Sequence, residues 1–270
     1  MYGPQRLERD ALPRFATLFD GWDETLIWSC IQGVMGEVYG VEGENGTLLA
    51  QAVLADFVFF AGDVSLAGEE AAAALAKNLP VCRDAFILAP ENDGWSRVIE
   101  KVHDGRCERA VRYATKKGGG FDRTRLQGFL NAVPDGFTIA PVGRELYGRA
   151  FEADWSRDLC AQYSSWEEYA RNGLGFMALR SGEPVAGASS YSHYKGGIEI
   201  EIDTRKDYRR RGLAAACASA LILKCLDLGL YPSWDAATPV SVALAEKLGY
   251  RFSHEYPVYV VKTRRGPDKK

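Results

Sequence analysis

The sequence predicts an α/β protein with a mixed sheet, and three stretches of it carry this prediction. Ile198–Ile202 alternates apolar and acidic residues, as a half-buried strand does. Leu213–Leu228 contains neither glycine nor proline and is rich in alanine and leucine, which favours a helix that ends at Gly229. Residues 233–236 and 240–248 then repeat the order of strand and helix. This order favours a sheet covered by helices.

Residues 1–120 predict a smaller α/β domain, in which short apolar runs indicate strands and stretches rich in alanine and glutamate indicate helices. Glu42–Gly46 has the sequence EGENG, which is typical of a hairpin turn. Lys116–Gly120 has the sequence KKGGG and predicts a linker, so we place the domain boundary at residue 120. The expected helices are 7–18, 66–77 and 93–102, and the expected strands are 28–41, 48–60, 85–89 and 110–115.

Residues 121–270 predict a second domain with its own helices and strands. Lys195–Gly197 predicts a turn between two strands, and 152–165 predicts a long loop between two helices. The expected helices are 124–131, 144–151, 166–172, 213–228 and 240–248, and the expected strands are 138–142, 175–179, 185–194, 198–202, 233–236 and 256–262.

Composition and charge argue against several classes of protein. The chain has 33 basic and 36 acidic residues, and its net charge of −3 argues against a nucleic-acid partner or a membrane surface. We find no apolar segment long enough to span a bilayer and no signal-peptide core, so the expected location is cytoplasmic. Six cysteines without a Cys-x-x-Cys pair and three scattered histidines predict neither a metal site nor a disulfide framework.

The most informative stretch is Arg209–Ala214, with the sequence RRRGLA, because it joins the alternating strand to the alanine-rich helix. The first N–H groups of a helix have no partner inside the helix and lie at the positive end of its dipole. Gly212 lets such groups approach a ligand without a side chain in the way. A strand, a basic glycine turn and a helix therefore predict a site for an anion such as a phosphate. The alternative is a basic surface that water solvates.

Arg209, Gly212 and Ala214 have the spacing of the motif Arg/Gln-x-x-Gly-x-Gly/Ala, and here the chain resembles the GNAT superfamily of N-acetyltransferases, which binds coenzyme A with this motif. The stretch 231–250 ends in Leu-Gly-Tyr and resembles the second motif of the same superfamily. The sequence CLDLGLYPSWDA at 225–236 resembles the branch that includes the zwittermicin A self-resistance acetyltransferase. With both motifs in the right order, the resemblance covers roughly residues 137–261.

The resemblance implies a GNAT-like acyl-CoA N-acyltransferase fold for the second domain, with acetyl-CoA (coenzyme A) as the cofactor. It also implies that a backbone N–H near Ile202 and Asp203 polarises the thioester carbonyl, at the point where the strand opens. The coenzyme-binding residues that it implies are Ile202, Asp203, Thr204, Arg209, Arg210, Arg211, Gly212, Leu213, Ala214, Thr238 and Ser241.

Glu199 and Glu201 are the candidates for the catalytic base, which must take a proton from the attacking amine. Both side chains point to one face of their strand because side chains alternate along it. Members of the superfamily often use a strand carboxylate in this region as the base. Glu201 is preferred because it lies nearer the glycine turn, and the alternative for both residues is an exposed face that forms ion pairs.

The leaving thiolate needs a group that protonates it, and the sequence offers several candidates. Many members of the superfamily use a tyrosine that falls at the position of Ala245 in this chain. Water, Ser241, Tyr250 or Tyr256 must serve instead, and Tyr250 therefore joins the two glutamates as a catalytic candidate.

Three functional classes remain open. The first is an acetyl-CoA-dependent N-acetyltransferase in which the primary amine of a small molecule attacks the thioester directly, with Asp154 and Asp158 holding a cationic acceptor. The second is a catalytically silent acyl-CoA-binding or regulatory module, which Ala245 favours. The third, a nucleic-acid binder, is disfavoured by the net charge. The expected partner is thus a small-molecule amine, without nucleic acid or membrane, and a homodimer is an alternative to a monomer.

The two halves of the chain are candidates for distant copies of one plan. A shift of 146 positions places 89–92 over 235–238 and 100–101 over 246–247, and an expected strand follows each set. The first half has no Arg-x-x-Gly-x-Gly/Ala, so it could not hold a pyrophosphate in the same way. Two interpretations stay open: a degenerate GNAT-like half that shapes the acceptor pocket, or an unrelated segment.

Overall fold

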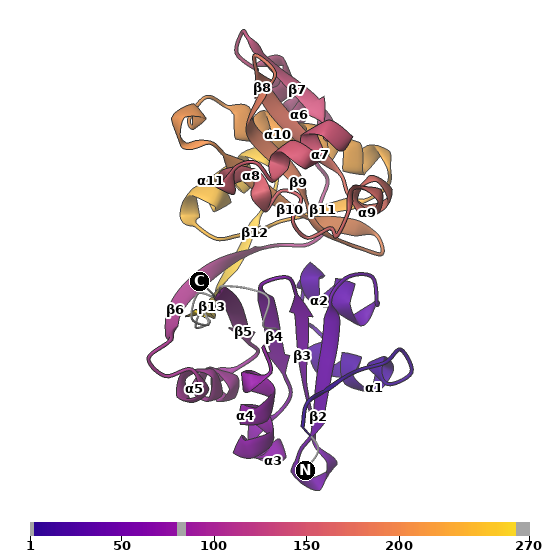
Figure 1. Ribbon diagram of the computed structural model, residues 1–270, viewed down its shortest axis with the longest axis vertical. Helices are drawn as coiled ribbons and strands as arrows, with labels where there is room; N and C mark the ends of the chain where they lie inside the picture. Colours follow the sequence, from indigo (N-terminus) through magenta and orange to yellow (C-terminus); the bar gives the residue numbers. More distant parts are fainter. Residues whose placement is uncertain (1–2, 80–84, 263–270) are drawn as a thin grey trace, which may run out of the picture. The chain divides into compact units, whose positions relative to one another are not determined.

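The computed structural model describes residues 3–79 and 85–262 of the chain. It divides the chain into two compact units, unit 1 (Met1–Arg112 with Glu255–Lys270) and unit 2 (Tyr113–His254), which are seen in Figure 1. Each unit combines helices with a sheet that has both parallel and antiparallel neighbours. The predicted class, α/β with mixed sheets, is therefore confirmed.

Unit 1 is built on a sheet with the strand order β1-β2-β3-β4-β5-β13-β6. β4 and β5 are parallel, while the pairs β2–β3 and β3–β4 are antiparallel. Trp95 is fully buried in the core of this unit and packs on Phe60, with 5.0 Å between ring centroids. The elements are β1 (Gln5–Arg6), α1 (Leu12–Ala16), η1 (Thr17–Phe19), α2 (Thr25–Ile31), β2 (Glu37–Glu42), η2 (Glu44–Gly46), β3 (Leu48–Leu54), β4 (Phe57–Ala61), α3 (Val64–Ala67), α4 (Glu69–Lys77), β5 (Ala85–Pro90), α5 (Asp93–Val102), β6 (Cys107–Thr115) and β13 (Phe252–Lys262).

Several predicted elements of unit 1 are wrong in extent or type. The expected helix 7–18 is only the short α1 (Leu12–Ala16) followed by η1 (Thr17–Phe19). The expected strand 28–41 contains the end of helix α2, whose N-cap Glu24 accepts a hydrogen bond from the Leu26 N–H. The expected strand 48–60 is the hairpin β3–β4, which turns at Ala55 in a left-handed conformation with φ 55°. The expected helix 66–77 is divided into α3 and α4 at Gly68, where φ is 89°. Apolar content alone does not separate a strand from a buried helix or locate a tight turn.

Strand pairing determines where the units divide. β13 pairs with β5, so the C-terminal strand belongs with unit 1, whereas the predicted second domain includes all of 121–270. The end of β6 pairs in turn with β12 in unit 2, through Tyr113 and Ala114. The expected linker 116–120 therefore lies inside unit 2, where the Lys116 N–H donates to the carbonyl oxygen of Arg251 at 2.8 Å.

Unit 2 contains a second sheet with the order β11-β10-β9-β8-β7. Helix α10 packs on β8, β9 and β10, and α6 packs on α10. The core between them includes Ile198, Ile200, Leu213, Cys217 and Leu221. The elements are α6 (Arg123–Asn131), β7 (Phe137–Pro141), α7 (Arg144–Ala150), α8 (Asp154–Arg157), α9 (Trp166–Asn172), β8 (Gly175–Arg180), β9 (Glu183–Tyr194), β10 (Gly197–Thr204), η3 (Lys206–Tyr208), α10 (Leu213–Asp227), β11 (Tyr231–Ser233), β12 (Asp235–Ala236) and α11 (Pro239–Leu248).

The order of elements is similar in the two units. In unit 1, β2, β3 and β4 are antiparallel, two helices follow, and β5 then lies parallel to β4 before α5. In unit 2, β8, β9 and β10 are antiparallel, α10 follows, and β11 then lies parallel to β10 before α11. This common order is what the interpretation of the first half as a GNAT-like copy requires.

The described residues contain five free cysteines, and the sixth, Cys82, lies outside them. Burial raises the pKa of the Cys217 and Cys225 thiols to about 12. These two thiols therefore pack as small apolar groups in the core. Across 3–79 and 85–262, no helix combines the length and the hydropathy needed to cross a membrane.

Candidate coenzyme and active site

The central strands of unit 2 part at one end. β10 and β11 pair in parallel only between Gly197–Glu199 and Tyr231–Ser233. β10 then continues to Thr204, whereas the chain after β11 forms β12, which pairs with β6 instead. Strand β10 therefore has an edge without a strand partner from Ile200 onward. This is the opening that the sequence analysis expects near Ile202.

Two backbone N–H groups near this edge donate to the carboxylate of the residue before them. The Ile202 N–H donates to Glu201 Oε1 at 3.1 Å, and the Thr204 N–H donates to Asp203 Oδ1 at 2.6 Å. Neither bond is part of the ladder between β10 and its neighbour. The two amides could therefore donate to a ligand if the carboxylates turned away.

The turn after β10 is built from arginines in an unusual backbone conformation. Arg210 and Gly212 both have left-handed φ angles, 61° and 80°. Arg209 Nε donates to the carbonyl oxygen of Thr204 at 3.1 Å, which fixes its guanidinium beside the end of β10. A Cβ built on Gly212 would meet no protein atom within 4 Å, so the need for glycine comes from φ and from the space that a ligand would use.

Helix α10 begins at this turn with its N–H groups open. Gly212 is the N-cap and no side chain caps the helix; the first bond of this end is from the Ala216 N–H to the Gly212 carbonyl. Helix α11, which follows β12, differs because the Thr238 hydroxyl accepts the Ser241 N–H at 3.2 Å. An uncapped N-terminus beside cationic side chains is a favourable place for a phosphate group.

A cavity of about 650 Å³ lies over this helix end, and the coenzyme-binding residues expected from the sequence line it, except Arg211. The Arg211 guanidinium lies 5.1 Å from the centre of the Tyr208 ring, and its Nη2 donates to the Asp207 carbonyl. The charges around the cavity are Arg209, Arg210 and Lys247 against Asp203. A net positive cavity with open amides fits the diphosphate of coenzyme A.

Part of the cavity wall was not predicted from the sequence. Val240, Ala243, Leu244 and Lys247 line the cavity together with Ser241, all from α11. Residues three and four apart share one face of a helix, so the spacing from Ser241 could have identified this face. Phe129 comes from α6, and nothing in the local sequence links it to the glycine turn.

Asp203 is the one acidic residue in the lining. Burial raises the pKa of its carboxyl, while the Thr204 N–H and the Arg209 guanidinium act in the opposite direction. Arg209 Nη2 lies 3.9 Å from Asp203 Oδ1, which is a loose ion pair. A carboxylate in this position adds negative charge where a polyanion would bind.

The two glutamates of β10 differ in environment, although both lie on the face opposite Ile198 and Ile200. Glu199 is buried, with 4% of its surface exposed, and its Oε1 accepts the Asp235 N–H at 2.7 Å. Glu201 is only partly buried, and its Oε1 accepts the Ile202 N–H. The hydrogen bond of Glu199 thus connects β10 to β12, whereas Glu201 lies at the open edge.

Of the three hydroxyl groups considered for the leaving thiolate, Ser241 is the one in the cavity lining. Its Oγ accepts Trp234 Nε1–H at 3.1 Å and keeps its own proton to donate. Tyr250 is buried in the core and donates to the Pro232 carbonyl at 2.6 Å, and burial raises its pKa. Tyr256 belongs to β13 in unit 1. The structure thus does not bring Tyr250 to the cavity.

The loop 152–165 and helix α9 contain a cluster of aromatic side chains that mainly pack against one another. The hydroxyl groups of Tyr163 and Tyr169 pair with the side chains of Ser190 and Ser189, both at 2.8 Å. Asp154, expected to hold a cationic amine, lies at the start of the short helix α8 and 3.8 Å from Arg157. Buried aromatic packing is therefore the better description of this cluster.

A sheet whose central strands part at the open N-terminus of a helix is the architecture of the GNAT class of N-acetyltransferases. The family comparison agrees: the model for GNAT acetyltransferases matches residues 16–259, and the chain belongs to this family. The match begins in unit 1 and includes all of unit 2, so the family covers both halves of the chain.

Three known proteins illustrate the relationship. A GCN5-related N-acetyltransferase-like protein from Streptococcus suis is 41% identical, with a TM-score of 0.82 over 94% of this chain and 99% of that chain. YdfB, an uncharacterized N-acetyltransferase of Bacillus subtilis, is 26% identical over 178 residues, which are 64% of this chain and 65% of YdfB, less than two thirds of that relative. A tandem GNAT protein from the clavulanic acid biosynthesis pathway is 9% identical, with a TM-score of 0.57 over 97% of this chain and 99% of that chain. At that identity the likeness is one of fold.

Proposed function

We propose that this protein transfers the acetyl group of acetyl-CoA to the primary amine of a small molecule. The observation that carries the proposal is the junction of β10 and α10. There an open strand edge meets an uncapped helix N-terminus in one positively charged cavity of about 650 Å³. Arg209, Arg210 and the first amides of α10 would hold the diphosphate, and the edge of β10 would receive the rest of the coenzyme.

The chain's own residues would then act on the attacking amine and on the leaving group. Acetyl-CoA supplies an acetyl group that is activated as a thioester. We assign the Ile202 N–H to the carbonyl oxygen, where it stabilises the growing negative charge. We assign Glu201 to the amine, whose surplus proton it accepts as the N–C bond forms and the C–S bond breaks. The Ser241 hydroxyl would donate a hydrogen bond to the departing sulfur, which takes its proton from water.

This assignment requires one local change at the strand edge. Glu201 Oε1 accepts the Ile202 N–H at 3.1 Å, so the proposed base and the proposed carbonyl donor satisfy each other. When the thioester carbonyl accepts the hydrogen bond of the Ile202 N–H in place of Glu201, the carboxylate would be free to turn toward the amine. Binding of the coenzyme would thereby prepare the base.

A catalytically silent acyl-CoA-binding module is the second candidate function. Ala245 is fully buried and carries no hydroxyl, so the tyrosine that many GNAT enzymes use is missing from α11. Ser241 lies one turn earlier in the same helix and lines the cavity, which favours an active enzyme. The zwittermicin A branch and a homodimer stay predictions, the latter to be tested by light scattering of the purified chain.

The deciding experiment measures acetyl-CoA binding and thiol release with the same preparation. We expect acetyl-CoA to raise the Tm and to release free coenzyme A when a suitable member of an amine panel is present. Thermal stabilisation without thiol release for any amine would support the silent module. Absence of stabilisation by either acetyl-CoA or coenzyme A would reject both functions.

A further inference from the structure

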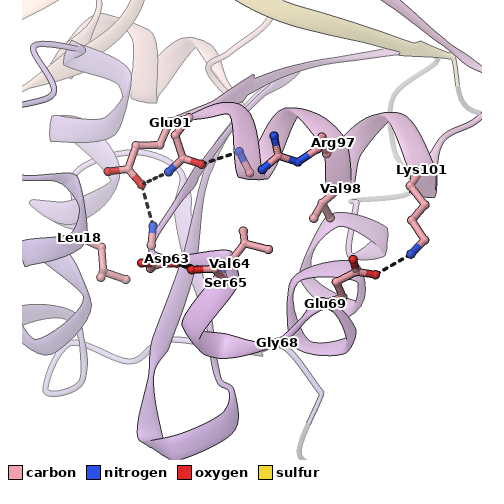
Figure 2. Close-up of a pocket in the computed structure, with 13 residues that line it drawn as sticks. Leu18, Asp63, Val64, Ser65, Gly68, Glu69, Glu91, Arg97, Val98 and Lys101 are labelled. Atoms are coloured by element: carbon pink, nitrogen blue, oxygen red, sulfur yellow. Dashed lines mark hydrogen bonds and ion pairs between the residues drawn. The ribbon is translucent and has the colours of Figure 1, made fainter.

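Unit 1 has a cavity of its own, with a volume of about 840 Å³. Figure 2 shows that its walls come from the end of β4, helices α3 and α4, the end of β5 and helix α5. Helix α5 contributes Gly94, Arg97, Val98 and Lys101 to the lining. Neither the family match nor the proposed function assigns a role to this cavity.

The cavity occupies the place in unit 1 that the coenzyme cavity occupies in unit 2. Both lie where two parallel strands are followed by helices, β4 and β5 in one case and β10 and β11 in the other. The lining positions of α5, Gly94, Arg97, Val98 and Lys101, coincide under the 146-position shift with lining positions of α11: Val240, Ala243, Leu244 and Lys247. The two cavities are therefore equivalent parts of a repeated architecture.

Their chemistry differs at the helix start, because unit 1 caps it with a carboxylate of its own and unit 2 has no side-chain cap there. Asp63 Oδ1 accepts the N–H groups of Ser65 and Leu66 at 2.8 and 3.2 Å, at the start of α3. Glu91 Oε2 accepts the Gly62 N–H at 2.9 Å, at the end of β4. The first two amides correspond to the helix start that unit 2 leaves without a side-chain cap. The Gly62 amide corresponds to the strand end, where the amides of unit 2 also donate to carboxylates. A diphosphate would meet two carboxylates here instead of free N–H groups.

The remaining charges divide the cavity into an acidic and a basic side. Glu69 and Lys101 form an ion pair at 2.5 Å and neutralise each other. Asp63 Oδ2 and Glu91 Oε1 receive no donor from the part of the chain that the structure describes, and Arg97, which lines the cavity from α5, has no ion pair there either. The Ser65 hydroxyl holds the pKa of Asp63 below its ordinary value, so this carboxyl is ionised at neutral pH.

We propose that the unit 1 cavity binds a small zwitterion of the amino-acid class and excludes coenzyme A. The ammonium group would bind between Asp63 and Glu91, and the carboxylate would bind the Arg97 guanidinium, which suits a carboxylate's two oxygens. The apolar wall, including Val98, leaves space for a side chain. The inference concerns unit 1 alone and does not depend on the proposed transfer reaction.

The test titrates the full chain by calorimetry with a panel of free L-amino acids, with cadaverine as an amine without a carboxylate and with glutarate as a dicarboxylate. We expect at least one amino acid to bind, cadaverine to bind more weakly and glutarate not to bind. Lack of binding by every amino acid, or tighter binding of glutarate, would overturn the proposal.

Isosteric variants locate the binding. Glu91→Gln and Asp63→Asn keep an oxygen for the backbone donors but lose the negative charge. Each variant should therefore lower the affinity for the amino acid by about tenfold or more. Arg97→Gln should weaken the binding of the amino acid but should not weaken that of cadaverine, which loses only a repelling charge. Asp93→Asn is the matched control, since Asp93 lies on α5 next to the cavity but not in its lining. Unchanged affinity in all three lining variants would refute the site.

A further arm tests the exclusion of coenzyme A. The variant Gly212→Asp removes the phosphate position of unit 2 and leaves unit 1 intact. We expect this variant to bind amino acids as the wild type does and to show no binding of coenzyme A. Coenzyme A that still bound, and was displaced by the amino acid, would show that the unit 1 cavity accepts a diphosphate and would refute the proposed charge preference.

Discussion

Glu199 accepts a hydrogen bond of 2.7 Å from the backbone N–H of Asp235, and it is also the last residue of β10 that pairs with β11. The carboxylate therefore joins β10 to β12 at the point where the sheet opens. Because Glu199 is buried and already serves as an acceptor there, it is poorly placed to take a proton from a substrate. Glu201, two residues further along the open edge, is better placed.

Substitution of the two glutamates by glutamine should separate these roles. Glu201→Gln should reduce kcat by about 100-fold and remove the acidic limb of the pH–rate profile, because a general base contributes on the order of 10²–10⁴. Coenzyme affinity should change little. Glu199→Gln keeps an oxygen for the Asp235 N–H and should retain kcat within a few-fold. A pH–rate profile altered in Glu199→Gln but not in Glu201→Gln would reverse the assignment.

The start of α10 gives a second prediction. Gly212→Asp places a negative charge against the phosphate position and should abolish coenzyme binding, measured by calorimetry. Gly229→Asp is the matched control at the other end of the same helix, with φ 69° against 80° and open space around its Cβ as well. Each variant should lose about 1 kcal/mol of stability from the left-handed conformation. Equal coenzyme affinity in the two variants would show that the phosphates do not bind at this turn.

Most residues lining the cavity that we propose for the coenzyme could be selected from the sequence, because they are local. Arg209–Ala214 is contiguous, and its conformation follows from one glycine and a helix start. The catalytic candidates were harder because their environment is not local. Alternation correctly places Glu199 and Glu201 on one face, but it cannot show that the Asp235 N–H binds one of them. The prediction of Tyr250 as a catalytic group was wrong for the same reason, because its hydroxyl donates to the Pro232 carbonyl on β11.

The fold of unit 1 was predicted less well, for reasons of pairing and turn geometry. The C-terminal strand β13 follows the helices of unit 2 in sequence, yet it pairs with β5 of unit 1. No local pattern in 252–262 indicates this partner. The shift of 146 positions was more informative: it places Asn92 over Thr238, and the structure shows both as side-chain N-caps of equivalent helices. Capping residues are a helix-start signal that survives when the remaining sequence has diverged.

Asp203 gives a prediction about the coenzyme affinity. Asp203→Asn keeps an acceptor for the Thr204 N–H but removes the negative charge from the cavity, so coenzyme A should bind several-fold more tightly at pH 7. Because burial raises the pKa of Asp203, its ionised form is disfavoured in the folded state and lowers stability as the pH rises. The variant should therefore have the higher Tm at pH 7, by a margin that narrows toward acidic pH. Asp227→Asn, at the far end of α10, is the charge-matched control, and an equal gain in coenzyme affinity there would contradict the local effect.

His103 gives a prediction about the pH dependence of stability. It is 3% exposed in unit 1, with Nε2 3.0 Å from the Ala76 carbonyl, and its buried Nδ1 has no partner within the described ranges. Burial lowers its pKa below the ordinary 6.5, so the folded state prefers the neutral ring, while the unfolded chain takes up a proton below that pH. The Tm should therefore fall as the pH decreases from 8 to about 5, in addition to the effect of the carboxylates.

His103→Gln can still donate to the Ala76 carbonyl but cannot take up a proton, so its Tm should depend less on pH over this range than that of the wild type. His254→Gln, at an exposed imidazole whose Nδ1 lies 3.0 Å from the Ser253 hydroxyl, is the control and should leave the wild-type profile unchanged. Differential scanning calorimetry at closely spaced pH values measures both. Parallel Tm profiles for His103→Gln and the wild type would show that the buried ring does not contribute to the acid sensitivity of unit 1.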